Sequence, residues 1–277
     1  MKRNTAVFML AAAAVLWSLG GVLIKSVELH PLAIAGTRSA IALLVIWGFV
    51  GRPKFTWSKA QLGGALAYAA TVMLFVAANR LTTAANAIML QFTAPIYVAL
   101  LAQKFLNEKN SALDWVAIVT TFVGIAMFFV DFLSPAGMLG NVFALLSGVS
   151  FACLVIFLRY QKEGSPILSI LLGNALTALI GLPFVAFGPP AAADWLPLIV
   201  LGVVQLGIPY ILYSLAIKHV SALDAILIPV LEPLLNPVWA FLLLRETPGQ
   251  WALLGGFVVL ASVTMRHVFV SKEAAPA

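Results

Sequence analysis

Charged side chains are scarce in this sequence. Only 9% of the 277 residues are Asp, Glu, Lys or Arg, whereas 62% are apolar or aromatic. A soluble globular domain needs far more polar surface than this composition supplies, so that class is excluded. The composition predicts an integral membrane protein.

Residues that form disulfides or bind metals are also few. The single cysteine, Cys153, excludes an internal disulfide, and its apolar surroundings favour a packing role. His30, His219 and His267 lie at separate helix ends, too scattered for a metal site. The sequence has no glycine-rich phosphate loop and no HExxH motif, which excludes nucleotide hydrolysis by this chain. No cofactor and no metal are expected.

Long apolar runs are abundant. Each has about the 20 residues that a helix needs to cross a bilayer. The links are short, so residues 1–277 are predicted to form a single membrane domain. The first run continues past Trp17 to Ile24 with no polar cleavage region, so we expect an uncleaved helix instead of a secretory signal. The runs cover approximately 5–24, 32–50, 60–79, 84–103, 113–130, 138–158, 166–187, 195–217, 222–244 and 249–266.

Positive charges are unevenly distributed over the predicted loops. With the amino terminus inside, 12 of the 16 Lys and Arg residues face the cytoplasm, as the positive-inside rule requires. We therefore predict a multi-pass protein of the cell (inner) membrane with both termini cytoplasmic. The asymmetry accounts for the net charge of +6 without a nucleic-acid partner.

The chain resembles itself at an offset of 138 residues. AANAIMLQFTAPIYVALLAQKFLNE, ending at Glu108, aligns with ALDAILIPVLEPLLNPVWAFLLLRE, ending at Glu246, and Pro95 stands opposite Pro233. Earlier in each half the offset is about 135, where Pro31 stands opposite Pro166. The pattern predicts two repeats, about 5–131 and about 138–269. Because each repeat has five helices, the second starts on the opposite side of the membrane. The predicted fold is all-α, with ten transmembrane helices in two inverted five-helix repeats.

These features resemble the EamA-type family of the drug/metabolite transporter superfamily over nearly the whole chain. The amino-terminal LWSLGGVLIK also resembles that family's first helix. The resemblance implies a secondary carrier for small metabolites, in a family that includes exporters of amino acids and other solutes. The most specific features are the doubled proline-bearing fourth helix, a loop glutamate (Glu108, Glu246) and a following helix with Trp and Gly (Trp115 with Gly124; Trp251 with Gly255 and Gly256).

Polar side chains inside the apolar runs are the candidate substrate-binding residues, because an ionised group in lipid is costly. At a rise of about 1.5 Å per residue, Glu232 and Arg38 differ in depth by roughly 8 Å. We predict that Arg38 binds the carboxylate and Glu232 the ammonium of a zwitterion, or that Glu232 carries a proton. The alternatives are a structural ion pair between them, or an Arg38 that reaches the outer surface. The other predicted binding residues are Asn236, Gln91, Thr93, Tyr97, Asn174, Trp17 and Tyr210.

Prolines recur every four residues in the ninth run, at Pro229, Pro233 and Pro237. Each lacks the N–H that would bond to the carbonyl four positions earlier. The freed carbonyls must line a cavity or be met by neighbouring helices. Together with Pro95 in the fourth run, these residues are predicted to form a hinge and gate, with a simple packing kink as the alternative.

The sequence thus predicts a secondary transporter of a small polar or zwitterionic metabolite, such as an amino acid, that works by alternating access. Two other functions stay open: an exporter of another small metabolite or cationic drug and, more remotely, an intramembrane enzyme with Glu232 as general base. We predict a non-enzyme, since no second carboxylate, histidine or nucleophile lies at comparable depth. The predicted partners are the solute and the lipid bilayer, and the residues leave the solute, the direction, proton coupling and the oligomeric state open.

Overall fold

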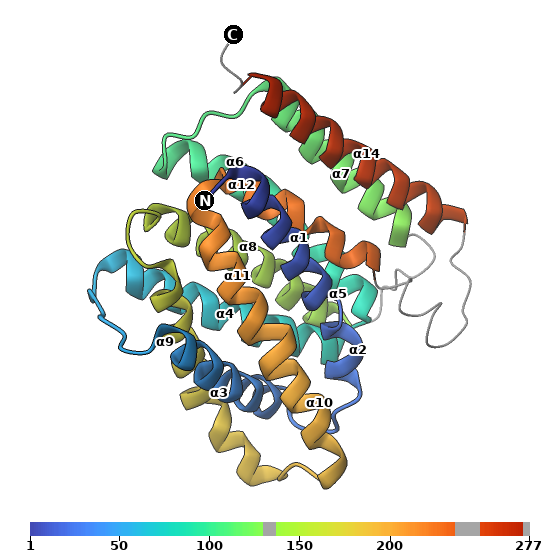
Figure 1. The fold of residues 1–277 in the computed structure, drawn as a ribbon. Helices are drawn as coiled ribbons and strands as arrows, with labels where there is room; N and C mark the ends of the chain where they lie inside the picture. Colours follow the sequence, from blue (N-terminus) through green and yellow to red (C-terminus); the bar gives the residue numbers. More distant parts are fainter. Residues whose placement is uncertain (130–136, 236–249, 274–277) are drawn as a thin grey trace.

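The computed structural model describes residues 1–129, 137–235 and 250–273. Within these ranges the chain consists of helices and their links, without a β-strand (Figure 1). The prediction of an all-α membrane protein is confirmed.

The helices of the first half follow the predicted runs closely. The first span is split into α1 (Arg3–Trp17) and α2 (Gly20–Lys25), and the fourth into α5 (Ala84–Gln91) and α6 (Ala94–Phe105). The other three are α3 (Pro31–Val50), α4 (Lys59–Leu81) and α7 (Ala112–Phe129).

The second half repeats this order. Its helices are α8 (Met138–Tyr160), α9 (Pro166–Gly181), α10 (Trp195–Val200), α11 (Ile208–Ala216), α12 (Ala222–Leu227) and α14 (Gln250–Glu273). Seven helical segments are long and apolar enough to cross a bilayer, and two shorter apolar ones lie in α7 and α14. With the ninth span, described as far as Leu235, these agree with the ten predicted runs. Asn236 and Pro237 lie outside the described residues.

Equivalent local signals start the fourth span of each half. The Thr83 hydroxyl accepts a hydrogen bond from the Asn86 amide at the start of α5 (3.0 Å). The Ser221 hydroxyl does the same for the Asp224 amide at the start of α12 (3.0 Å). Such N-caps satisfy backbone N–H groups that have no partner within the helix. The two caps are 138 residues apart, the same offset as the sequence repeat.

Five of the described spans depart from regular α-helix, and one of them, the seventh, ends in a 3-10 helix at Leu182–Phe187. The chain breaks at residues 18–19 between α1 and α2, and at 92–93 just before Pro95 in α6. It tightens to a 3-10 turn at Ile228–Val230, around Pro229, and widens to a π-helical stretch at Leu201–Gly207. The prolines explain two of these departures, because they cannot donate the helical hydrogen bond. Irregular backbone of this kind is tolerated inside membrane proteins where it lines a cavity or is buried in protein.

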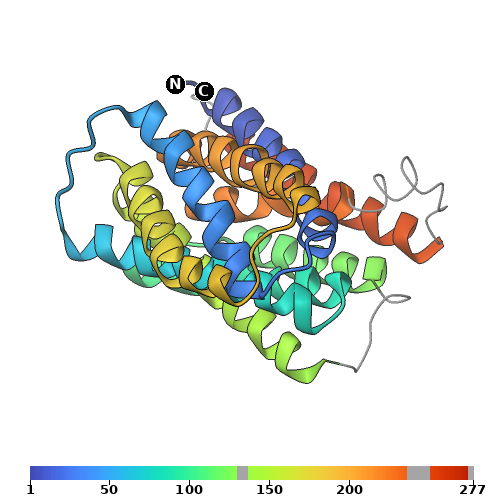
Figure 2. The same cartoon turned by 90° about the horizontal axis from the view of Figure 1, so that it is seen from below.

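The two halves pack against each other in matched pairs. Helix α4 of the first half packs against α8 of the second half, and the equivalent helices α11 and α1 pack against each other in the same way. Helices α1 and α11 lie side by side in Figures 1 and 2. The contact of α4 with α9 corresponds to that of α3 with the π-helical stretch. The contacts α3 with α9 and α7 with α14 are their own counterparts. This is the pattern expected of two repeats related by a two-fold axis.

Candidate functional site

A cavity of about 40 Å³ lies between the two halves, where the irregular helices meet. Its walls come from α1, α3, α4, α5, α8, the π-helical stretch, α11 and the short helical segment 231–235. The lining residues are Trp17, Arg38, Thr71, Val72, Phe75, Gln91, Phe151, Gln205, Leu206, Tyr210 and Glu232. Five of the nine predicted binding residues are in this set: Trp17, Arg38, Gln91, Tyr210 and Glu232.

Arg38 is a buried cation in the cavity wall. Its side chain is 1% exposed, so it does not extend to the outer surface. Its Nη1 donates a hydrogen bond to Gln205 Oε1 (3.0 Å), while its Nε is buried with no hydrogen-bond partner. None of the ion pairs among the described residues joins Arg38 to Glu232. The guanidinium therefore faces the cavity with a donor still available.

Gln205 is a site residue that the sequence reasoning missed. It lies in the π-helical stretch, and π-helical turns are frequent at functional sites. Its amide nitrogen packs so close to Gly20 that a Cβ at Gly20 would come within 2.8 Å of it. The signal in the sequence was a lone amide between Gly202 and Gly207 in an apolar run. The glycines place α3 against this stretch, since Cβ atoms there would meet Ile41 and Val45.

Glu232 lies in the short helical segment 231–235, directly after the 3-10 turn. It is partly exposed and borders the cavity. In the described part of the chain it forms neither a hydrogen bond nor an ion pair. Pro229 and Pro233 are buried, so two of the four predicted hinge residues lie within three positions of Glu232 along the chain.

Aromatic rings form one wall of the cavity. The Trp17 ring lies 5.0 Å from that of Tyr210 and 5.3 Å from that of Tyr213, between centroids. The Tyr68 ring stands edge-on to Tyr210 at 4.8 Å. Trp17 Nε1 and the Tyr213 hydroxyl are buried and have no hydrogen-bond partner. Buried polar groups are nearly always paired. Trp17 lines the cavity, so its Nε1 is available to a bound solute or to water, whereas Tyr213 lies behind the lining.

Three predicted binding residues lie outside the cavity lining. Asn174 accepts a hydrogen bond from the Tyr68 hydroxyl (3.0 Å) and donates one to the Ile170 carbonyl (3.0 Å). The Thr93 hydroxyl donates to the Leu90 carbonyl (2.7 Å) at the break between α5 and α6. Tyr97 packs partly buried against the core. Asn174 acts on the site indirectly, because it fixes Tyr68 in the aromatic wall.

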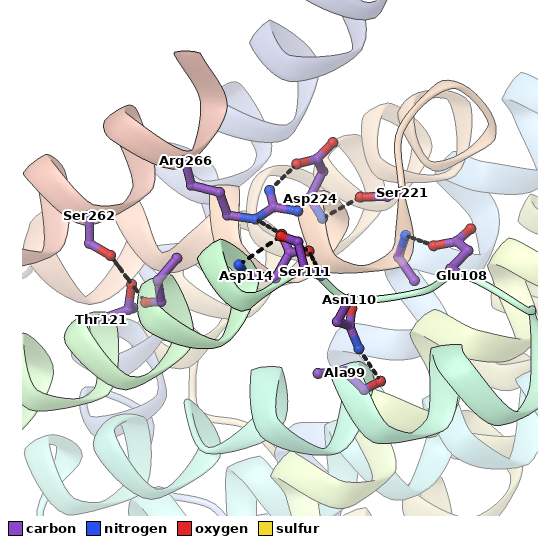
Figure 3. Close-up of polar contacts among 12 residues, drawn as sticks. Ala99, Glu108, Asn110, Ser111, Asp114, Thr121, Ser221, Asp224, Ser262 and Arg266 are labelled. Carbon is purple, nitrogen blue, oxygen red and sulfur yellow. Dashed lines mark hydrogen bonds and ion pairs between the residues drawn. The ribbon is translucent and has the colours of Figure 1, made fainter. Parts of the chain in front are cut away.

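A second polar cluster surrounds the start of α12, at the predicted cytoplasmic end (Figure 3). Arg266 of α14 lies between Asp224 of α12 and Asp114 of α7, donating to both, the latter at 2.8 Å. Arg3 of α1 also pairs with Asp224 (3.1 Å). Close by, Glu108 accepts from the Ala222 amide (2.8 Å) and from Arg159 (2.8 Å). The first turn of α12 is thus connected to both halves by charge-assisted hydrogen bonds.

Comparison with known proteins identifies the family. The sequence model of the EamA-like transporter family matches residues 4–130 and again residues 138–266. The chain belongs to this family. It is therefore a multi-pass membrane transporter of a small molecule, and the double match explains the paired packing of its halves.

Individual transporters and one solved structure are similar to this EamA-like protein over nearly its whole length. A protein of Archaeoglobus fulgidus, named as an uncharacterized transporter, is 29% identical over 260 residues, which cover 91% of this chain and 92% of that protein. The uncharacterized transporter YxxF of Bacillus subtilis (strain 168) is 23% identical over 285 residues, covering 96% and 91%. A solved structure, titled only as a crystal structure of a protein, shares the fold with a TM-score of 0.81 at 15% identity, and covers 99% of this chain and 100% of its own.

Proposed function

We propose that this transporter moves a small polar or zwitterionic metabolite, such as an amino acid, across the inner membrane by alternating access of its two halves. The observation that carries the proposal is one cavity between the halves, bordered by both Arg38 and Glu232, which are not paired with each other. A zwitterion would bring an opposite charge to each. The distribution of basic residues supports cytoplasmic termini.

The unpaired donors of the cavity favour a solute with a carboxylate. Arg38 Nε and Trp17 Nε1 can donate hydrogen bonds but cannot accept them. Gln205 is a neutral partner for Arg38. A buried guanidinium whose charge is not compensated costs free energy, and a carboxylate is a strong and directional partner for it. Glu232 would then bind the ammonium group, or carry a proton in exchange for the solute.

The small size of the cavity supports alternating access, in which the cavity walls move apart. A volume of about 40 Å³ is room for a few water molecules, so a metabolite requires the walls to separate. The breaks at Pro95 and Pro229 supply hinges in the two equivalent spans, next to Gln91 and Glu232. In inverted-repeat carriers, interrupted helices of this kind border the substrate site.

A cationic solute is the second candidate function. Aromatic rings attract cations, and Trp17 and Tyr210 line the cavity together with Glu232. Arg38 would repel such a solute, which is why the zwitterion is preferred. An enzyme is disfavoured, because Glu232 is the one carboxylate among the described lining residues, and general acid–base chemistry needs a second group.

Flux of labelled amino acids in proteoliposomes tests the proposal. Removing a charge-assisted hydrogen bond costs about 1.5–3 kcal/mol, so Arg38→Ala should lower flux by roughly 10- to 100-fold. Glu232→Gln should lower flux or abolish its pH dependence. The matched control is Lys54→Ala, which removes an exposed cation from a loop.

Three outcomes would count against this assignment. Unchanged flux and unchanged pH dependence in both folded variants would remove Arg38 and Glu232 from the site. Cation flux that survives Arg38→Ala but is lost in Glu232→Gln would support the second candidate. A labelled solute that is chemically converted would instead indicate an enzyme.

A further inference from the structure

A larger hollow of about 500 Å³ lies on the flank of the molecule, away from the central cavity. It is bordered by the start of α4, the end of α6 and the second half of α8, all at the predicted cytoplasmic end. We refer to it as the lateral groove. Its lining residues are Lys59, Ala60, Leu101, Phe105, Cys153, Ile156, Phe157 and Tyr160.

The floor of the lateral groove is apolar and lies at membrane depth. From Tyr160, at the end of α8, to Cys153 it extends about 10 Å along the helix. Gly63 lets the Phe157 ring pack directly on α4, since a Cβ there would be 2.6 Å from the ring. This fixes α8 close to α4, while Leu101 and Phe105 of α6 border the groove as well. In a membrane, a cleft of this polarity suits an acyl chain better than water.

The mouth of the groove is positively charged. Lys59 lines it directly, and the Lys104 ammonium lies 5.6 Å from the centre of the Phe105 ring. Lys162 borders an adjoining polar hollow that shares Phe105 and Tyr160 with the groove. None of these three lysines belongs to an ion pair among the described residues.

We infer that the lateral groove binds an anionic phospholipid of the cytoplasmic leaflet. One acyl chain lies over α8 between Leu101 and Phe157, and the headgroup phosphate lies among Lys59, Lys104 and Lys162. Basic residues beside clefts between transmembrane helices, on the cytoplasmic side, are a recognised mode of anionic lipid binding. The three uncompensated lysines distinguish this site from a general lipid-facing surface.

The single cysteine gives a direct measurement. Cys153 lines the groove, so a bound acyl chain should slow its reaction with a maleimide. Using purified protein in detergent, we would measure this rate while adding phosphatidylglycerol or phosphatidylcholine. We expect phosphatidylglycerol to protect Cys153 at concentrations at least about tenfold lower, given about 1 kcal/mol for each nearby lysine.

Lysine variants test whether the preference for an anionic lipid comes from the positive charge at the mouth of the groove. Replacing Lys59, Lys104 and Lys162 by Gln should abolish the preference for the anionic lipid, whereas replacing Lys2, Lys54 and Lys109 by Gln should leave it unchanged. The second set removes the same charge from exposed positions of the same predicted face that do not line the groove. Single lysine variants serve if the triple variant does not fold.

Several results would overturn the inference. Equal protection by both lipids, or a preference that persists without the three lysines, would exclude an anionic site. Protection that depends on protein concentration instead of lipid would indicate a second copy of the chain as the occupant. The reaction of Cys153 does not depend on transport, so failure of this test and failure of the zwitterion proposal are distinguishable.

Discussion

Arg38 is held inside the protein by an amide where a carboxylate would be the usual partner. Gln205 accepts from its Nη1, and Gly20 leaves the space that the Gln205 side chain occupies. A neutral acceptor fixes the direction of the guanidinium but does not cancel its charge. The charge therefore remains available to a solute, which a structural ion pair would prevent.

Substitution of Gln205 tests this interpretation. Gln205→Glu should pair with Arg38, keep the fold at least as stable, and lower amino-acid flux by roughly tenfold or more, because the new carboxylate competes with the solute. Gln205→Leu should instead destabilise the protein by about 1–3 kcal/mol, since the buried Nη1 loses its acceptor. Thermal unfolding and proteoliposome flux measure the two effects. Gln103→Glu, at an exposed position of α6, is the matched control. Unchanged flux in Gln205→Glu would contradict the role given to Arg38.

At the residue scale, the sequence identified the charged members of the cavity but not all of their neighbours. Glu232 and Arg38 stand out because a charge within an apolar run requires shelter. Gln205 is neutral and falls in no motif, and its position depends on the packing of α3 against a π-helical stretch. Asn174 stays a predicted binding residue. In the structure it accepts a hydrogen bond from Tyr68 and lies outside the cavity lining, because a buried amide equally well supports a neighbouring side chain.

At the element scale, the start of α12 is connected to three other parts of the described structure. The Ala222 amide donates to Glu108 in the loop after α6, and Asp224 accepts from Arg3 of α1 and Arg266 of α14. Within α12, the Ser221 hydroxyl accepts from the Asp224 amide. The equivalent position in the first half is Asn86, which donates to the side chains of Thr82 (3.2 Å) and Asn141 (3.0 Å). The two equivalent helix starts thus differ in charge.

Asp224→Asn places an amide at the start of α12, as Asn86 does at the equivalent start of α5. It leaves Arg266 and Arg3 without one of their carboxylates, and breaking a buried ion pair typically costs about 3–5 kcal/mol. We expect a clearly lower thermal midpoint of the detergent-purified protein. Glu28→Gln, which removes an exposed carboxylate, should leave the midpoint unchanged. Equal midpoints for the wild type and Asp224→Asn would show that this network does not stabilise the fold.

The helix irregularities differ in how far the sequence could predict them. Pro95 and Pro229 indicate their breaks, because the missing N–H is a local property of the residue. The break after Trp17 contains no proline. Pro209 follows the π-helical stretch and cannot donate to the Gln205 carbonyl four residues earlier, but a missing N–H alone does not distinguish a π-helical stretch from a break. The π-helical stretch is positioned by glycines whose partners, Ile41 and Val45, are in a helix more than 150 residues earlier in the chain.

At the scale of the whole molecule, the two halves cross where α3 meets α9. A Cβ at Gly181 would lie 2.6 Å from the Gly36 Cα and would also overlap the Leu32 carbonyl oxygen. Both neighbours are backbone atoms, which cannot rotate away. The pair of glycines therefore sets how closely the repeats approach each other.

Gly181→Ala should force these helices apart. We expect a loss of roughly 1–3 kcal/mol or more from overpacking, seen as a lower thermal midpoint and less monodisperse protein on size exclusion. Gly48→Ala in α3 is the control, because a Cβ there meets no atom within 4 Å and alanine favours helix. If both variants behaved like the wild type, the crossing would not limit the approach of the halves.

The two halves have diverged at the charged positions of the central cavity, so that each contributes one charge of a different sign. The counterpart of Glu232 in the first half is Ala94, and at the offset that pairs Pro31 with Pro166 the counterpart of Arg38 is Gly173, whose space is taken by the Tyr68 ring. Two identical halves would have presented two cations and two anions, and a zwitterion could have docked in either of two opposite poses. With one of each retained, a single pose would satisfy both ends of the zwitterion that we propose as the solute.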